Sequence, residues 1–287
     1  MWTQIAHHIS KVTGKNFSVN NRRSVSGGCI NQGYTVTGDT GSYFVKLNQA
    51  SQVAMFEAEA LGLKQILETA TIRVPKPICW GTAAESAYLV LEWLELNRGD
   101  AQSWEQMGRA LAAMHRWAGS SAFGWDTNNT IGSTPQINSW TADWAEFYAQ
   151  HRLGYQFQLA KRRQGHFPQQ ERLLTAIPQL LAQKPQPSLV HGDLWGGNAA
   201  CTATGEPVIF DPAVYFGDRE VDIAMTELFG GFPTAFYRGY NEVFPLDAGY
   251  ERRKTLYNLY HILNHFNLFG GGYASQANRM IEQILSA

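Results

Sequence analysis

Residues 191–198 read HGDLWGGN, a segment in which a histidine, an acid, an indole and an amide surround three glycines. Asp193 is followed five residues later by Asn198. A carboxylate can accept a proton, and an amide oxygen can bind a hard cation. A second acid, Asp211, follows a short apolar run, VIF at 208–210. The segment therefore predicts a polar active centre beside a short β-hairpin.

The composition excludes several classes of protein. A chain of 287 residues is long enough for a large core and two lobes. The net charge of −1, with no basic block, disfavours nucleic acid or an anionic membrane as a partner. No segment reaches the length of an apolar membrane span, and the first residues lack the apolar run of a signal peptide. The three cysteines are far apart and form no CxxC pair, which favours a reducing compartment. We expect a soluble cytoplasmic protein.

The predicted secondary structure changes character near residue 95. Before it, we expect a helix at 2–13, a β-hairpin around TGDTGS at 37–42, a helix at 51–68 with Ser51 as its N-cap, and a buried strand at 87–94. After it, helices are predicted at 102–117, 140–160, 170–183, 219–229, 251–268 and 274–285, with one β-rich segment around 188–213. The fold class is α+β, with a small β-rich lobe at 1–94 and a larger, mainly helical lobe at 95–287.

A glycine-rich turn and a strand lysine suggest a phosphate site. Gly28 and Gly33 have the spacing of a P-loop, but Tyr34 stands where that motif needs lysine. Gly27 and Gly28 remain as a turn whose N–H groups could cradle a phosphate; the alternative is an ordinary hairpin loop. Lys46 lies in YFVKL at 43–47, on the third predicted strand, after the TGDTGS turn.

The helix predicted after Lys46 carries two acids. In protein kinases a strand lysine binds the nucleotide phosphates and pairs with a glutamate on the next helix. Glu59 is the predicted partner of Lys46, with Glu57 as the alternative. The alternative is that Lys46 is a solvated charge at the edge of a sheet, with no role in binding.

The segment 191–198 resembles the kinase catalytic loop, H-R-D-L-x-x-x-N. By that resemblance Asp193 is the base, and Asn198 and Asp211 hold magnesium. Gly192 replaces the arginine that serves kinases switched by activation-loop phosphorylation. This replacement suggests a small-molecule kinase without that switch.

Along its whole length the chain resembles the fructosamine kinase (ketosamine 3-kinase) family, within the aminoglycoside phosphotransferase and choline kinase branch of the kinase-like fold. The motifs that carry the resemblance are GGCINQGY (27–34), FVKLN (44–48), MFEAEALGL (55–63), VPKP (74–77), LAAMH (111–115), PQINSW (135–140), HGDLWGGN (191–198), IFDPAVYFGDREVDIAMTELFGGF (209–232) and LNHFNLFGGGY (263–273).

The resemblance implies a two-lobed protein-kinase-like fold with ATP and Mg²⁺. It implies phosphorylation of the 3-hydroxyl of a small-molecule or protein-linked ketosamine, which leads to deglycation. Lys46 and Glu59 would orient the nucleotide, and the backbone at Glu92, Trp93 and Leu94 would meet the adenine. Two alternatives stay open: a kinase of the aminoglycoside or choline type, and a non-catalytic nucleotide-binding scaffold.

Several residues around the loop have two interpretations. Trp195 is predicted to stack on the substrate sugar, or else to pack the loop. His191 is predicted to anchor the loop, and Asp222 to brace its backbone. His261 and His265 lack the glutamate of a HExxH zinc motif, so helix packing or pocket lining is expected. LFGGF at 228–232 would wall the substrate pocket or turn the chain.

Cys29 lies within the glycine-rich turn. Loop N–H groups and Lys46 would favour its thiolate, which is the form that oxidises. We therefore predict a redox-sensitive thiol and a monomer or redox-dependent homodimer; the alternative is a small residue that fits a tight loop.

Overall fold

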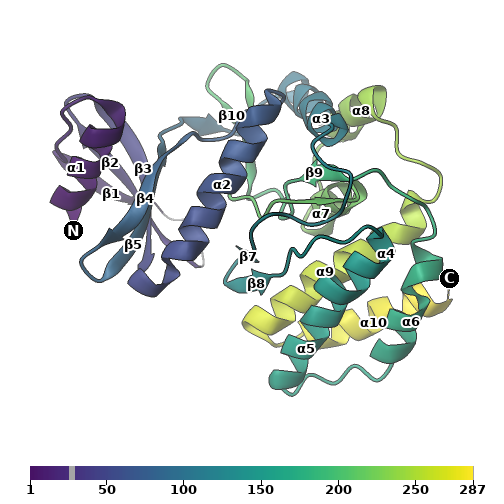
Figure 1. The fold of residues 1–287 in the computed structure, drawn as a ribbon. Helices are drawn as coiled ribbons and strands as arrows, with labels where there is room; N and C mark the ends of the chain where they lie inside the picture. The colour runs from purple at the N-terminus through teal and green to yellow at the C-terminus, as the bar shows by residue number, and fades with distance from the viewer. Residues whose placement is uncertain (26–29, 287) are drawn as a thin grey trace. The chain divides into compact units, whose positions relative to one another are not determined.

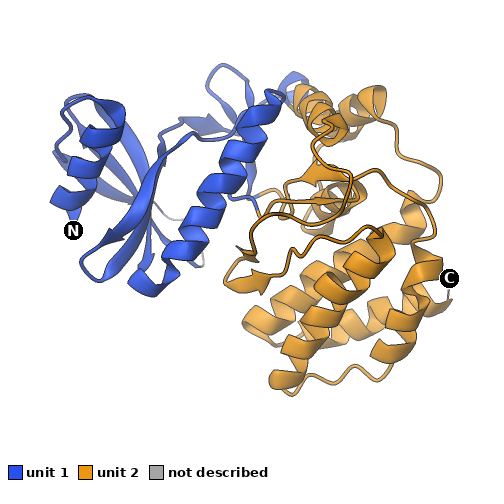
Figure 2. Ribbon diagram, viewed as in Figure 1, with its two compact units in different colours: residues 1–103, 197–212 blue, residues 104–196, 213–287 orange. Residues whose placement is uncertain are grey.

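The computed structural model describes residues 1–25 and 30–286 (Figure 1). The chain forms two compact units (Figure 2). The first comprises Met1–Ser103 together with Gly197–Pro212, and the second comprises Trp104–Gly196 together with Ala213–Ala287. The first unit therefore extends beyond residue 94, where the sequence placed the boundary, and it includes a segment from late in the chain.

The first unit is built on a five-stranded antiparallel sheet in the order β1-β2-β3-β5-β4. Its strands are β1 (Asn21–Val25), β2 (Gln32–Gly38), β3 (Gly41–Gln49), β4 (Pro77–Ala83) and β5 (Ser86–Glu92). The helices of this unit are α1 (Trp2–Thr13) and α2 (Val53–Thr69), with a 3₁₀ turn, η1 (Ala50–Gln52), before α2.

The alternation of side chains along β3 gives the sheet two different faces. Val45 and Leu47 belong to the buried cluster that includes Ile5 and Ile9 of α1. Successive strand residues point to opposite faces, so Lys46 points away from α1. Helix α2 packs against β4 and β5 and carries Glu59 to Lys46. One face of the sheet thus packs into the hydrophobic core, and the other carries the buried ammonium group of Lys46.

A small second sheet completes the first unit. It has the order β11-β10-β6 and consists of β6 (Leu96–Asn97), β10 (Ala199–Thr202) and β11 (Pro207–Ile209). Strand β6 follows shortly after β5 and pairs with β10 through Asn97 and Cys201. The segment after β5 is therefore hydrogen-bonded to the hairpin that follows Asn198.

The second unit is mainly helical. Its helices are α3 (Ala101–Arg116), α4 (Trp144–Phe147), α5 (Tyr155–Arg162), α6 (Gln170–Leu180), α7 (Glu220–Leu228), α8 (Thr234–Val243), α9 (Tyr250–Phe269) and α10 (Tyr273–Ser286), and a π-helical segment, η2 (Tyr148–Gly154), joins α4 to α5. Two short pairs, β7 (Asn129–Ile131) with β8 (Thr134–Gln136) and β9 (Ser188–Val190) with β12 (Tyr215–Gly217), complete it. Helix α9 packs against α5, α7 and α10 and forms the centre of this unit.

Most predicted elements are present, with corrections at their ends. Ser51 is not a helix cap, because it lies in the 3₁₀ turn and Gln52 precedes α2. The helix predicted at 140–160 starts only at Trp144, where the Asp143 side chain caps the N–H of Glu146. Helix α8 and the β7–β8 hairpin were not predicted. Among the described helices, none has the length and apolar character needed to cross a membrane.

Candidate active site

Lys46 lies between two carboxylates of the first unit. Its Nζ donates to Oε1 of Glu59 at 2.6 Å and to Oδ1 of Asp211 at 2.6 Å. The lysine is buried, and the side chain of Asp211 is 44% exposed. The predicted pairing with Glu59 is present, whereas Glu57 is exposed on α2. Asp211, 165 positions from Lys46 in the sequence, thus shares this cation with Glu59.

The electrostatics of this triad favour an added cation. Burial by itself would lower the pKa of Lys46, but the carboxylates of Asp211 and Glu59 outweigh it and raise the pKa. Burial raises the pKa of Glu59, against the attraction of Lys46. With both acids ionised, one positive and two negative groups leave a charge of −1. The partly exposed Asp211 is where a dication would offset it.

Asn198 and Asp211 are held together by the β10–β11 hairpin. The N–H of Phe210 donates to the carbonyl of Asn198 at 3.0 Å, and Ala199 pairs with Ile209. Asp211 has φ of 58°, a left-handed conformation that aspartate tolerates better than most residues. An amide oxygen and a carboxylate fit Mg²⁺, which takes one or two protein carboxylates and completes its shell with phosphate oxygens and water.

The Lys46 face of the sheet also carries a groove. It has a volume of about 470 Å³ and is lined by residues that include Val25, Thr35, Ser42 and Trp93. The strand register places Thr35 and Ser42 on the same face as Lys46. A hollow of this size suits a small ligand. We call Glu92, Trp93 and Leu94, the residues predicted to meet the adenine, the hinge. The hinge residue Trp93 therefore lines a groove on the lysine-bearing face.

Asp193 lies in a loop of the second unit that is fixed through its backbone. The N–H of Asp193 donates to Nδ1 of His191 at 3.2 Å. The N–H groups of His191 and Gly192 donate to the two oxygens of Asp222, at 2.6 and 2.8 Å. His191 and Asp222 are buried. The predicted anchoring by His191 and bracing by Asp222 are both confirmed.

Asp222 has a further partner that the sequence did not reveal. Nε2 of His115, on α3, donates to Oδ2 of Asp222 at 3.1 Å, and Nδ1 of His115 bonds the Tyr240 hydroxyl at 2.8 Å. Burial would raise the pKa of Asp222, but the hydrogen bonds and nearby histidines outweigh it and lower the pKa. Asp222 therefore stays ionised and keeps accepting both loop N–H groups.

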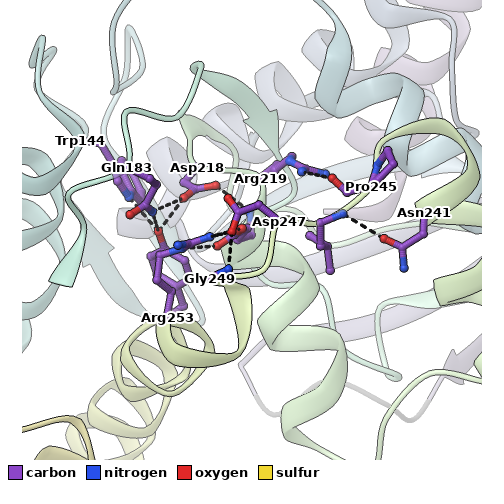
Figure 3. A network of polar contacts seen from close by, with 12 residues as sticks. Trp144, Gln183, Asp218, Arg219, Asn241, Pro245, Asp247, Gly249 and Arg253 are labelled. Carbon is purple, nitrogen blue, oxygen red and sulfur yellow. Dashed lines mark hydrogen bonds and ion pairs between the residues drawn. The ribbon is translucent and has the colours of Figure 1, made fainter. Parts of the chain in front are cut away.

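The start of α7, which presents Asp222, is fixed by a second polar network (Figure 3). Asp218 accepts from the Tyr257 hydroxyl at 2.6 Å, and Gln183 donates to it at 3.2 Å. Arg253 donates to both oxygens of Glu220, each at 2.7 Å, and also to Asp247 at 2.5 Å. Bidentate charged pairs fix direction as well as distance. The first turn of α7 thus has a defined orientation.

Glycine at position 192 is required by the backbone. Its φ is +81°, and a Cβ there would overlap the carbonyl oxygen of Ala213, whose own N–H donates to His191 at 2.8 Å. An arginine, as in H-R-D kinases, would not fit this loop conformation. The replacement noted in the sequence therefore has a local steric cause.

This geometry makes a stability prediction. Gly192→Ala should destabilise the protein by roughly 2–4 kcal/mol, because it adds left-handed strain and a backbone clash. Gly196→Ala is the matched control, since nothing lies within 4 Å of a Cβ at that position. Urea unfolding of both variants measures the difference. Equal stability of the two variants would contradict the steric requirement at 192.

Trp195 begins a chain of aromatic contacts in the second unit. We call Trp195, Phe229, His265, Phe269 and Tyr273 the aromatic cluster. Trp195 meets Phe229 edge-on at 6.4 Å between ring centroids, and Phe229 lies 4.9 Å from His265. His265 also contacts Phe269 and Tyr273. Trp195 is 39% exposed and Phe269 is 55% exposed, so part of the cluster faces solvent.

The two histidines of α9 have different surroundings. Nδ1 of His265 donates to the carbonyl of His261 at 2.8 Å, so its Nε2 is the acceptor in the neutral ring. Burial lowers the pKa of His261 to about 3 and also lowers the pKa of His265. Within the described residues, no group of three or more His, Cys, Asp or Glu side chains could hold a metal ion. His265 belongs to the aromatic cluster. Phe232 of LFGGF is buried against Trp104 and Phe236.

Three predicted residues, Gly27, Gly28 and Cys29, lie outside the described part of the chain. The other two cysteines, Cys79 and Cys201, are buried. Burial raises the pKa of Cys79 to about 12 and also raises that of Cys201. Neither is therefore suited to form a thiolate.

Comparisons with known proteins match the whole length of the chain. The family model described as fructosamine kinase matches residues 1–287. A probable ketoamine kinase from Synechocystis sp. is 61% identical over 99% of this chain and 97% of its own length. The chloroplastic protein-ribulosamine 3-kinase of Arabidopsis thaliana is 45% identical over 95% of this chain and 85% of its own.

A solved structure shows the same fold. The crystal structure of a candidate fructosamine-3-kinase from Haemophilus somnus 129PT has a TM-score of 0.93 and 32% identity, covering 99% of this chain and 98% of that chain. Likeness over both full lengths confirms the α+β kinase-like fold that the sequence predicted.

Proposed function

The chain belongs to the fructosamine kinase family and is a kinase, and we propose that it transfers phosphate from Mg·ATP to the 3-hydroxyl of ketosamines. The observation that carries the proposal is the contact of Lys46 with both Glu59 and Asp211, at 2.6 Å each. A strand lysine shared by a helix glutamate and a metal-binding aspartate is the arrangement that orients nucleotide phosphates in kinases.

The first unit is the proposed donor side. Lys46, oriented by Glu59, would bind the phosphates, and the groove that Trp93 lines would take the nucleoside. The backbone at Glu92, Trp93 and Leu94 is proposed to meet the adenine, and the turn with Gly27 and Gly28 to cover the phosphates. Mg²⁺ bound by Asn198 and Asp211 would neutralise charge on the phosphate oxygens.

The second unit is the proposed acceptor side. Asp193 would accept the proton of the sugar hydroxyl as that oxygen attacks the terminal phosphorus of ATP and the bond from this phosphorus to ADP breaks, so that ADP leaves. The N–H groups of His191 and Gly192 donate to Asp222. These bonds fix the backbone next to Asp193, so the loop is ordered before substrate binds. The aromatic cluster, which includes Trp195 from the same loop as Asp193, would offer flat faces for the sugar and for the attached amine.

The chemistry of the product gives the reaction a purpose. In a ketosamine the amine is on C1 and the keto group is C2. Once C3 carries phosphate, enolisation between C1 and C2 allows the C3–O bond to break and inorganic phosphate to leave. Hydrolysis then releases the amine, so phosphorylation leads to deglycation.

A substrate panel tests the proposal. ADP release should be fast with ribulose-lysine, erythrulose-lysine or fructose-lysine, and absent with aminoglycosides and choline. Turnover of an aminoglycoside or of choline, with none of a ketosamine, would favour the alternative acceptors. Absence of turnover with all of them, together with tight nucleotide binding, would favour a non-catalytic scaffold.

A substitution of Trp195 distinguishes an effect on acceptor binding from an effect on nucleotide binding. Trp195→Ala should raise the ketosamine KM about 2- to 10-fold, the size of one aromatic contact, and leave the ATP KM unchanged. Trp140→Ala is the matched control, because Trp140 is a comparably exposed indole of the same unit that packs on Phe216. Steady-state kinetics in both substrates measures the effect. A change in the ATP constant alone would make Trp195 a loop-packing residue.

Location and assembly stay predictions. The cysteine pattern favours a reducing compartment such as the cytoplasm, while the Arabidopsis relative is named chloroplastic. We keep the monomer or redox-dependent homodimer, with Cys29 as the proposed reactive thiol, as a hypothesis.

A further inference from the structure

Arg73, in the connection between α2 and β4, contacts two parts of the proposed donor side. We propose that Arg73 is a positioning residue that couples the hinge residue Glu92 to the strand leading to Asp211. The inference rests on the assignment of the nucleotide to the first unit, to which all three residues belong. The side chain of Arg73 makes one connection, and its backbone makes the other.

The side chain fixes the hinge. Nη2 of Arg73 donates to Oε1 of Glu92 at 2.6 Å, and the N–H of Lys76 donates to Oε2 at 3.2 Å. The N–H of Glu92 in turn donates to the carbonyl of Lys76 at 2.9 Å. Both the side chain and the N–H of Glu92 are thus committed to residues 73–76. The direction in which the chain leaves β5, toward Trp93 and Leu94, is set by these bonds.

The backbone of Arg73 fixes the metal-binding strand. Its carbonyl accepts from the N–H of Ile209 at 3.1 Å, and Arg73 forms a parallel bridge with Val208. Ile209 is the last residue of β11, two positions before Asp211. The next N–H, that of Phe210, holds the carbonyl of Asn198. One residue therefore connects the segment proposed to meet the adenine with the hairpin proposed to hold the metal.

The partial exposure of the Arg73–Glu92 ion pair indicates that its loss would change nucleotide affinity more than stability. The side chains of Arg73 and Glu92 are 34% and 33% exposed, and exposed ion pairs contribute little to stability. Nε of Arg73 is buried without a hydrogen-bond partner among the described residues, so the contact through Nη2 directs the guanidinium. Removing the pair should leave the fold stable but loosen the hinge. The effect should therefore appear in nucleotide affinity.

Arg73→Met tests the coupling, because it keeps the backbone carbonyl and the side-chain length while removing the guanidinium. We expect the ATP KM and the calorimetric Kd for Mg·ADP to rise about 3- to 10-fold, the size of one ordinary hydrogen bond. The ketosamine KM and the melting temperature should not change. Glu92→Gln should have the same effect, and the double variant should be no worse than either single variant. Arg73→Lys should restore part of the affinity.

Lys64→Met is the matched control. Lys64 is a cation of the same unit whose Nζ lies 4.6 Å from the centroid of the Trp80 ring. Its replacement by methionine should leave Mg·ADP binding unchanged. Wild-type nucleotide affinity in both Arg73→Met and Glu92→Gln would overturn the inference, as would a change confined to the ketosamine KM. If the wild type binds Mg·ADP but phosphorylates no ketosamine, the proposed function fails while the affinity series still decides the role of Arg73.

Discussion

Asp193→Asn should bind Mg·ATP as the wild type does and lose turnover by ~10²–10⁴-fold, the usual loss when a general base is removed. The substitution keeps the shape of the side chain but removes its ability to take the hydroxyl proton. The loop itself should persist, because Asp222 holds it through the N–H groups of His191 and Gly192. Turnover is measured by ADP release, and binding by calorimetry.

Glu57→Gln serves as the control for loss of a carboxylate, because Glu57 is exposed on α2. It should retain full activity. An Asp193→Asn enzyme within about threefold of the wild type would remove Asp193 from the proton transfer, since general-base loss typically exceeds 10²-fold.

The second large effect is expected at Asp211. Asp211→Asn should abolish the Mg²⁺ dependence of ATP binding and lower kcat/KM by about 10³-fold, because two neutral amides are weak ligands for a hard dication. Asparagine tolerates the left-handed backbone at this position, with φ of 58°, better than alanine does. The variant therefore separates loss of the ligand from backbone strain.

Calorimetric titration of ATP with and without Mg²⁺ measures the effect. Lys46 would still have Glu59 as a partner, at 2.6 Å in the wild type, so nucleotide binding without metal should remain. Asp211→Ala should lose the metal dependence too, with an added stability cost of about 1–2 kcal/mol from the strained backbone. An unchanged Mg²⁺ effect in Asp211→Asn would contradict the assignment of the metal ligand.

The sequence predicted the parts of this site that carry local signals. Lys46 lies on an alternating strand, Glu59 on a periodic helix, and Asp193 and Asn198 in one short motif. Each of these signals spans only a few residues. The pairing of Lys46 with Glu59 was predicted from the kinase-like pattern, whereas the contact of Lys46 with Asp211 was not. Sequence alone left Glu57 as an alternative partner of Lys46. The structure excludes this alternative, because Lys46 contacts Glu59 and Glu57 is exposed.

Other features depend on distant partners and carry no local signal. His115 meets Asp222 from 107 positions away, and Arg73 meets Glu92 and Ile209 from separate segments. Helix α8 was missed because Gly239 interrupts its pattern. That glycine allows close packing, since a Cβ there would overlap the carbonyl of Glu105 on α3. These features were not predicted because they depend on contacts between segments that are far apart in the sequence, which the pattern of a single segment does not encode.

The position of the transferred phosphate on the sugar tests the proposed function most directly. A ketosamine such as ribulose-lysine, incubated with the enzyme and Mg·ATP, should give a single phosphorylated product. Proton–phosphorus correlation NMR on that product should show coupling of the new phosphorus to H3 of the sugar. The same product should release lysine and inorganic phosphate on standing, as elimination from C3 requires. Coupling to the protons of a terminal carbon, or a stable product that releases no amine, would contradict the account.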